Sequence, residues 1–184
     1  MKIIFLNGPP GCGKDTAADN IGMKVHRLKF AAPIKRMVAG CLNESLDWIE
    51  KHKDLPDERL NGETARKFLI RLSEELIKPA YGDEFFGRCL VEELIKTEEG
   101  GSNEFALITD SGFKSEVIPV VSHYGLKNCI KVEIHRPYKD FTNDSRSYWT
   151  MSGLRTIVLI NDGPVDQLGP KLFGILSNVW GCTR

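Results

Sequence analysis

Three glycines and a lysine near the start of the chain have the types and spacing needed to bind an anion. Gly8, Gly11 and Gly13 lie within six residues, and Lys14 follows the last of them. Glycine can take a positive φ and places no Cβ between its backbone and a ligand, so successive N–H groups can point at one anion. Lysine adds a compact, mobile positive charge. The combination suits the phosphates of a nucleotide, with Lys14 beside the β and γ phosphates.

The spacing fits the Walker A phosphate-loop pattern, G-x-x-x-x-G-K-[ST], with one departure. Lys14 is followed by Asp15, and the hydroxyl residue, Thr16, comes one position later. A carboxylate can hold Mg²⁺ directly or through water, so we expect Asp15 and Thr16 to hold Mg²⁺ with ATP. Simpler roles stay open: Asp15 also suits a helix N-terminus, and Thr16 a first-turn hydroxyl. We place Cys12 in the ATP-binding loop too, where a small loop-filling role is the simpler alternative.

The elements around this loop alternate between strand and helix. Residues 3–6 predict a strand before the loop, and residues 14–23 predict a helix after it. Apolar runs predict further strands at 25–30, 105–108, 130–134 and 157–160. Helical spacing predicts helices at 33–42, 63–77, 83–97, 115–124 and from about 164 onward. We therefore expect one α/β domain over residues 1–184, with a doubly wound parallel sheet flanked by helices, the P-loop fold.

Finer expectations follow from individual residues in these elements. The runs at 105–108 and 157–160 are continuous and predict strands buried on both faces, whereas lysine and glutamate alternate through 130–134 and predict one wetter face. We expect Pro119 to interrupt its helix and Gly169-Pro170 to kink or split the last one. Residues 138–153 are polar without periodicity, which is typical of a lid or a binding loop.

Polar residues follow three more of the predicted strands. They are Thr109-Asp110, His135-Arg136 and Asn161-Asp162. Ligands of such sheets lie beyond the carboxyl ends of the strands, so these residues and the phosphate loop should converge. We expect Asp110 to act on Mg²⁺-bound water or on the acceptor, and Asn161 and Asp162 to line the adenine pocket. A helix cap for Asp110 and turn roles for the other two are the simpler alternatives.

Composition excludes several classes of protein. Lys plus Arg and Asp plus Glu both number 25, so the net charge is zero and favours neither nucleic acid nor an anionic membrane as partner. No apolar run reaches membrane-spanning length, and the N-terminus predicts a strand rather than a signal peptide. Five scattered cysteines without a C-x-x-C pair indicate free thiols. We expect a cytoplasmic protein, in the host cytoplasm if viral. Zero charge mildly favours association, so a homodimer stays open.

Six segments together resemble the bacteriophage-type deoxynucleoside monophosphate kinases of the adenylate-kinase-like P-loop kinase superfamily. The segments span nearly the whole chain: Gly-Cys-Gly-Lys-Asp-Thr at 11–16, Phe-Ala-Ala-Pro-Ile-Lys at 30–35, Arg66 near the start of a long helix, Ile-Thr-Asp at 108–110, Arg136-Pro137 with 142–147, and Ile-Asn-Asp-Gly at 160–163. The loop is specific, and the other segments are short. Such kinases usually carry an arginine two residues after the strand aspartate, where this chain has Gly112, with Lys114 beyond it.

The resemblance implies transfer of the γ-phosphoryl group of ATP to a deoxynucleoside 5′-monophosphate, with Mg²⁺ as cofactor. It implies a helical monophosphate-binding insert at about 31–97 and a lid at about 137–153. The expected catalytic residues are Lys14, Arg66, Asp110, Arg136 and Arg146, and the expected acceptor-binding residues are Lys35, Arg66, Asp110 and Lys114. Arg66 should bind the acceptor's α-phosphate bidentately, and Arg136 and Arg146 should move onto the phosphates as the lid closes.

Alternatives remain open for these residues and for the function. Arg66 also suits a helix-flank salt bridge, Lys35 a surface lysine, and the two lid arginines solvated charges. A different P-loop kinase would act on a sugar acid, a coenzyme precursor or phosphomevalonate. A regulatory module would bind ATP without transferring phosphate. A switch GTPase is disfavoured, since the chain lacks an Asn-Lys-x-Asp guanine signature. Base choice should depend on residues 30–45 and 66–90.

Overall fold

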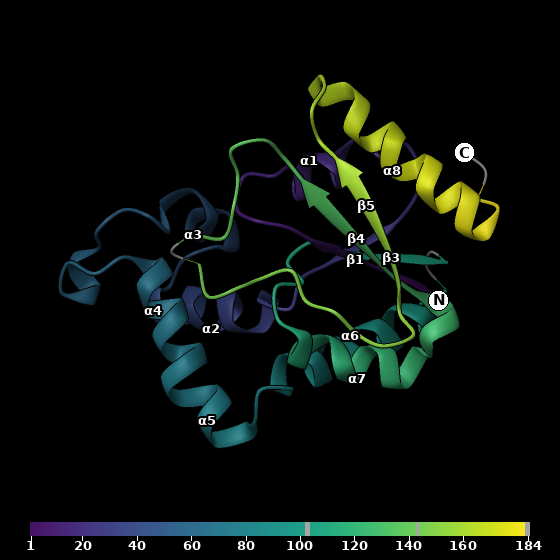
Figure 1. Ribbon diagram of the computed structural model, residues 1–184. Helices are drawn as coiled ribbons and strands as arrows, with labels where there is room; N and C mark the ends of the chain where they lie inside the picture. Colours follow the sequence, from purple (N-terminus) through teal and green to yellow (C-terminus); the bar gives the residue numbers. More distant parts are fainter. Residues whose placement is uncertain (102–103, 143, 183–184) are drawn as a thin grey trace.

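A computed structural model describes residues 1–101, 104–142 and 144–182. Its centre is a five-stranded parallel sheet with strand order β2-β3-β1-β4-β5. The strands are β1 (Lys2–Asn7), β2 (His26–Leu28), β3 (Phe105–Ile108), β4 (Cys129–His135) and β5 (Arg155–Ile160). Helices lie on both faces of this sheet (Figure 1). The α/β class and the doubly wound parallel sheet of the P-loop fold are therefore confirmed.

The two faces of β1 show how the helical layers are held. Ile4 and Leu6 pack in a cluster with α1 (Lys14–Asp19) and α8 (Val165–Trp180). Ile3 and Phe5 pack on the other face, in a cluster with α6 (Phe85–Glu99) and α7 (Lys114–Tyr124) (Figure 1). All four β1 side chains are fully buried. Because successive strand residues point to opposite faces, one apolar run anchors both layers and fixes where the loop after β1 emerges.

A helical insert between β2 and β3 lies to one side of the sheet (Figure 1). It consists of α2 (Ala32–Leu42), α3 (Leu46–His52), a 3₁₀ turn (Glu58–Leu60), α4 (Ala65–Arg71), a π-helical turn (Leu72–Ile77) and α5 (Lys78–Tyr81). The insert has a small core of its own, made by α2, α3 and α4. Across the described ranges, no helix is long and apolar enough to cross a membrane. The five cysteines all lie in those ranges and are free thiols.

Two helix ends differ from the predictions. The first helix ends at Asp19, four residues early, and Asn20 bonds back to the carbonyl of Thr16. The helix predicted to stop at Ile77 continues to Tyr81 through Pro79, which lies in the first turn of α5, directly after the wider π turn. Pro79 has no N–H to donate to the preceding turn, but that turn is π-helical, so the regular hydrogen-bond pattern is already changed there. Gly82, at φ 86°, then ends it.

Neither Pro119 nor Pro170 breaks its helix, so the predicted interruption at Pro119 and the predicted split at Pro170 are wrong. Each is the sixth residue of a continuous helix, α7 and α8. Tertiary packing outweighs the missing backbone hydrogen bond. A Cβ built on Gly169 would lie 1.9 Å from the carbonyl oxygen of Asn20, so α8 lies directly on the end of α1. Likewise a Cβ on Gly87 would lie 2.9 Å from the Pro119 ring, which α6 therefore covers.

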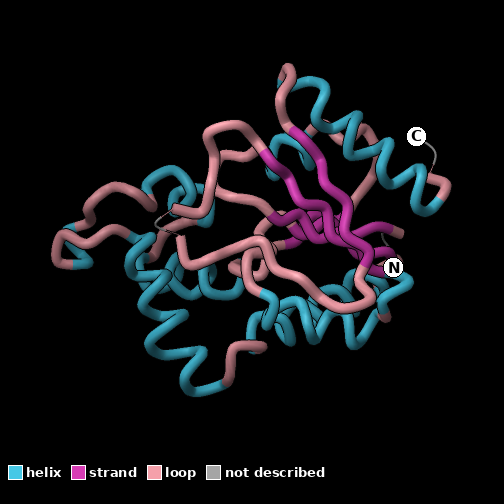
Figure 2. The backbone as a smooth tube through the Cα atoms, in the orientation of Figure 1, coloured by secondary structure: helices cyan, strands magenta, loops and turns pink. Residues whose placement is uncertain are grey.

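The burial predictions for two strands are wrong. β5 is the edge of the sheet, and Val158 and Ile160 are 54% and 47% exposed rather than buried. In β4, Lys131 is fully buried instead of facing water, and its ammonium group contacts the Trp149 carbonyl and Glu133. The cause is the long connection from β4 to β5, which folds back beside the sheet (Figure 2). Its Trp149 carbonyl accepts a hydrogen bond from the Lys131 ammonium group.

Candidate functional site

The loop after β1 has the backbone geometry of an anion-binding loop. Gly13 caps α1 with φ 106°, and Gly11 has φ 70°, so both occupy the left-handed region that favours glycine. A Cβ built on Gly8 would lie 2.6 Å from the carbonyl oxygen of Ile134 and 2.7 Å from the sulfur of Cys12. The three predicted glycines are therefore required by backbone conformation or close packing.

Lys14 is folded onto this loop. Its Nζ donates hydrogen bonds to the carbonyl oxygens of Gly8 at 2.6 Å and Pro9 at 2.8 Å. Partial burial, opposed by Cys12, lowers the pKa of Lys14. Cys12 is fully buried, and burial raises the pKa of its thiol despite the nearby Lys14 ammonium. The thiol is thus protonated and poorly nucleophilic, which suits the loop-filling role. Within the described residues, the Lys14 ammonium bonds only to backbone oxygens and the thiol, so it can transfer to a bound phosphate.

Asp15 lies where α1 meets the end of β3. Its Oδ1 is 3.0 Å from Lys29 Nζ and accepts a hydrogen bond from Thr109 at 3.2 Å. Burial works to raise the pKa of Asp15, but the hydrogen bonds and charges of its partners outweigh burial and lower it. No group of three His, Cys, Asp or Glu side chains in the described ranges could hold a metal alone. Mg²⁺ at nucleotides usually takes one or two carboxylates plus phosphates and waters, so Asp15 with Thr109 fits. Metal contacts by Asp15 and Thr16 stay a prediction.

A cavity of about 610 Å³ opens beside the phosphate loop and extends under the helical insert. This volume lies in the range of small-molecule sites. Six cationic side chains line it: Lys14, Lys29, Lys35, Lys53, Arg66 and Arg146. Every one of these cations has an oxygen partner, a carboxylate or, for Lys14, a carbonyl. These oxygen partners hold the cations around the cavity. A bound phosphate could take the place of the partners there.

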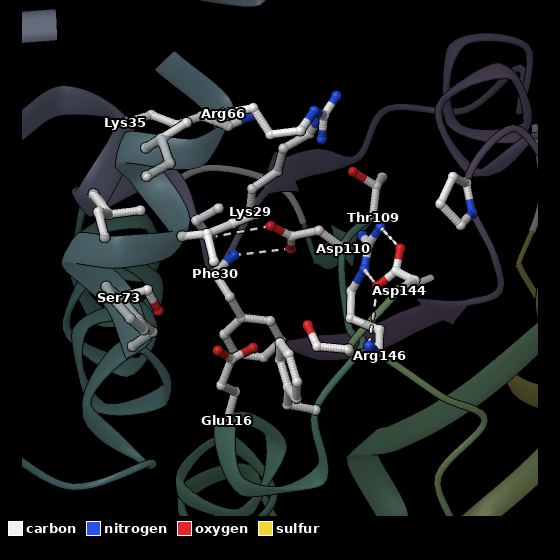
Figure 3. Close-up of a pocket in the computed structure, with 18 of the residues that line it drawn as sticks. Lys29, Phe30, Lys35, Arg66, Ser73, Thr109, Asp110, Glu116, Asp144 and Arg146 are labelled. Carbon is white, nitrogen blue, oxygen red and sulfur yellow. Dashed lines mark hydrogen bonds and ion pairs between the residues drawn. The ribbon is translucent and has the colours of Figure 1, made fainter. Parts of the chain in front are cut away.

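Arg66 and Lys35 line the insert side of the cavity (Figure 3). Arg66 is half exposed rather than packed, and its Nη2 lies 3.0 Å from the Asp54 carboxylate. Arg66 thus forms the salt bridge considered from the sequence and also lines the cavity. Lys35 pairs with Glu50, which also contacts Lys53. Although burial opposes it, hydrogen bonds from both lysines lower the pKa of Glu50 to about 2.

Asp110 anchors the start of the insert. Its two oxygens accept hydrogen bonds from the backbone N–H groups of Phe30 at 2.9 Å and Ala31 at 3.0 Å (Figure 3). Burial raises the pKa of this carboxyl, opposed by those two bonds. The cap that we considered for the helix after β3 is instead made to the backbone before α2, because β2 and β3 are neighbours. Asp110 also lines the cavity, so a role toward the acceptor stays a prediction.

Arg146 covers the position where the resembling kinases carry an arginine. A Cβ built on Gly112 would lie 2.3 Å from Cγ and Cδ of Arg146, so the arginine stem rests on the glycine backbone. The guanidinium is held by Asp144, with Nε 2.8 Å from Oδ1, and lines the cavity. Lys114 is exposed at the start of α7 and is absent from the lining in the described chain. In the described chain Arg146 therefore lies over position 112 and lines the cavity, whereas Lys114 does not line it; a phosphate-binding role of either residue stays a prediction.

The connection between β4 and β5 contains the predicted lid at 137–153, and position 143 lies outside the described residues. One part is packed down: Trp149 is buried against Phe5 and donates its indole N–H to the Ser111 carbonyl at 3.0 Å. The other part crosses the phosphate loop, where Arg136 donates to the Gly11 carbonyl at 3.1 Å. Closure of this segment stays a prediction.

Asn161 and Asp162 lie behind the phosphate loop. The Asn161 amide donates to the Cys12 carbonyl at 2.8 Å, and a Cβ on Gly13 would lie 2.7 Å from its nitrogen. Asp162 is exposed and pairs with Lys171 at 3.1 Å. In the described chain neither residue lines the cavity. Asn161 supports the loop, and the adenine contacts of both residues stay a prediction.

Four residues at the site were missed by sequence reasoning. Asn7 ends β1 and donates from Nδ2 to the carbonyls of Ser111 and Ser147, tying the loop to the lid segment. Lys29 follows β2 and pairs with Asp15, a place at a strand end that could have indicated it. The others are Lys139, beside Gly11, and Glu116, at the cavity floor. Neither carries a local sequence signal.

Comparison with known proteins shows that the fold of this chain resembles that of solved structures. No protein-family model and no curated protein matches the chain. Among solved structures, a sugar kinase from Janibacter sp. HTCC2649 in its unliganded form is 13% identical, with a TM-score of 0.56, covering 96% of this chain and 95% of that one. Dephospho-CoA kinase from Campylobacter jejuni is 15% identical over 96% of this chain and 97% of its own, with a TM-score of 0.44. The Janibacter structure shares the overall fold of this chain along nearly its whole length.

Proposed function

We propose that the protein is a phosphotransferase that moves the γ-phosphoryl group of ATP to a deoxynucleoside 5′-monophosphate. The observation that carries this proposal is that the phosphate loop and Arg66 line one cavity. Phosphoryl transfer needs two phosphate groups held next to each other and surrounded by positive charge. A protein that only binds ATP needs no second group of cations beyond its loop.

The residues divide the work between donor and acceptor. The loop N–H groups and Lys14 bind the donor phosphates, while Arg66 and Lys35 bind the acceptor's phosphate. Arg146 lies near the phosphate loop, close enough for its charge to lower the pKa of Lys14. Burial and Cys12 have larger effects on that pKa. Arg146 can therefore contact the transferring group. When bound, Mg²⁺ neutralises β and γ oxygens, and Asp15 would hold it.

The identity of the acceptor is supported by the apolar part of the cavity. Beyond the cations, its walls include Ile34, Leu69, Phe86 and Phe113. Aromatic and aliphatic walls suit a flat nucleobase, whereas a sugar acid presents hydroxyls on every side. A sugar acid stays the second candidate acceptor, since this chain shares its fold with a protein described as a sugar kinase.

The test is a coupled ADP-release assay with ATP, Mg²⁺ and a panel of deoxy- and ribonucleoside monophosphates. We expect turnover with at least one deoxy form. Arg66→Ala should lose turnover about 100-fold or more while ATP affinity stays within a few-fold, since Arg66 serves the acceptor. Arg71→Ala is the matched control, because Arg71 is exposed on the same helix and pairs with Glu63. Silence across the panel, with ATP still bound, would refute the nucleotide-kinase proposal.

A further inference from the structure

The end of the cavity away from Arg66 contains a buried carboxyl group. Glu116, in the first turn of α7, is only 5% exposed, yet it lines the cavity and points into it (Figure 3). Arg66 and Glu116 stand at opposite ends of the view, with Phe30 and Asp110 between them. Phe86 and Phe113 also line the cavity. A carboxyl in such apolar surroundings is costly unless something pairs with it.

The pairing of Glu116 within the protein is incomplete. Its ion-pair partner in the described residues is Lys78, whose Nζ is 3.7 Å from Oε1. That distance is too long for a good hydrogen bond. The Lys78 ammonium is instead bonded to Glu74 at 2.7 Å and lies 4.0 Å from the centre of the Phe113 ring. The Glu116 oxygens thus keep acceptor capacity on the side that faces the cavity.

We propose that Glu116 recognises the acceptor's base and selects guanine, an inference that rests on the proposed kinase function. A carboxylate presents two adjacent acceptors. Guanine offers two adjacent donors, N1–H and the 2-amino group, and can therefore bind it in a bidentate manner. Adenine and cytosine each offer one amino group on that edge, and thymine offers one N–H. Only guanine satisfies both oxygens of the ionised Glu116 carboxylate.

The protonation state of Glu116 makes its pairing with guanine depend on pH. Burial raises the pKa of Glu116 to about 8, opposed by Lys78 and assisted by the nearby carboxyls of Asp110 and Glu74. Without a bound acceptor, Glu116 is therefore a neutral acid at pH 7. Two N–H donors favour the ionised form, so binding of guanine releases a proton to solvent. The affinity for the guanine substrate should accordingly increase as the pH rises from 6.5 to 8.5.

The experiment compares turnover of dGMP, dIMP, dAMP, dCMP and dTMP by the wild type and Glu116→Gln. Hypoxanthine in dIMP keeps N1–H but lacks the 2-amino group, so its KM should be about 10-fold or more above that of dGMP. Glu116→Gln should raise the KM for dGMP about 10- to 100-fold, keep kcat within a few-fold, and bring dGMP and dIMP close together. Glu84→Gln, a change of the same kind at the N-cap of α6, where the side chain is 46% exposed, is the control.

The outcomes distinguish failure of the guanine inference from failure of the proposed kinase function. Turnover of monophosphates with an unchanged dGMP-to-dIMP ratio in Glu116→Gln would overturn the role of Glu116 and leave the kinase standing. Preference of the wild type for another base, or equal use of dGMP and dIMP, would overturn it too, even if the variant failed to fold. Absence of turnover with every nucleotide would remove the proposed function itself and the inference with it.

Discussion

Replacing Gly112 with alanine should abolish most catalysis without touching a charged group. Gly112 does not have a left-handed φ, so its backbone accepts a side chain. The new Cβ would lie 2.3 Å from Cγ and Cδ of Arg146 and 2.7 Å from its Cβ. These atoms belong to the base of the side chain, so rotation of the guanidinium alone cannot relieve the clash. Arg146 must leave the cavity and give up its bonds to Asp144.

The size of the effect follows from what Arg146 does in the proposed reaction. Loss of one preorganised donor to the transition state typically costs about 3 to 4 kcal/mol, or about 10²- to 10³-fold in kcat. Gly112→Ala and Arg146→Ala should therefore have similar defects, and the double variant should be no worse than either, because both changes remove the same group. ATP binding should change only a few-fold, since the loop and Lys14 are untouched.

The assay is kcat from ADP release, with ATP affinity measured separately by calorimetry. Gly174→Ala is the matched control, because a Cβ there meets no atom within 4 Å. A Gly112→Ala enzyme with near wild-type kcat, beside an impaired Arg146→Ala enzyme, would refute the idea that Gly112 seats the arginine. So would a double variant whose defect is the product of the two single defects.

Three further predictions concern binding and stability. Lys14→Met should weaken ATP binding at least 10-fold by calorimetry, and an unchanged affinity would contradict a nucleotide site at the loop. Lys131→Met should cost about 3 kcal/mol in urea unfolding, since it leaves Glu133 without its buried partner; a loss below about 0.5 kcal/mol would contradict this. The pKa of Glu116 is about 8 in the folded protein, whereas its ordinary value is 4.5. Between pH 4.5 and pH 8 the folded state therefore binds one more proton than the unfolded state. The free energy of unfolding should therefore decrease by at most about 5 kcal/mol as the pH rises from 5 to 8. Glu116→Gln should reduce this fall in calorimetric scans, whereas an unchanged pH dependence would contradict the assignment.

The parts of the fold that follow from local sequence were predictable. A buried strand, a glycine-rich turn and a lysine are adjacent in the chain, so the phosphate loop needs no tertiary information. The same holds for β3, a continuous apolar run. β5 has an equally apolar run but lies at the sheet edge, and no local pattern gives the order of strands.

The parts that depend on distant contacts were not predictable. Lys131 is buried because the connection to β5 returns over it and offers the Trp149 carbonyl. Arg146 and Gly112 lie far apart in the chain, and only the fold shows that one rests on the other. Glu116 has an ordinary sequence context on α7, and its burial follows from α6, which packs on its backbone, and from Lys78 of α5, which lies near its carboxyl. Such sites need the structure.

The central claim is that this cavity transfers phosphate from ATP to a deoxynucleoside monophosphate. The most direct measurement is to incubate the protein with Mg²⁺, dGMP and ATP labelled on the γ-phosphate, and to separate the nucleotides. We predict that the label appears in dGDP, and that Lys14→Met abolishes its appearance. Label that stays in ATP, or that is released only as inorganic phosphate, with every deoxynucleoside monophosphate supplied as acceptor would contradict the claim.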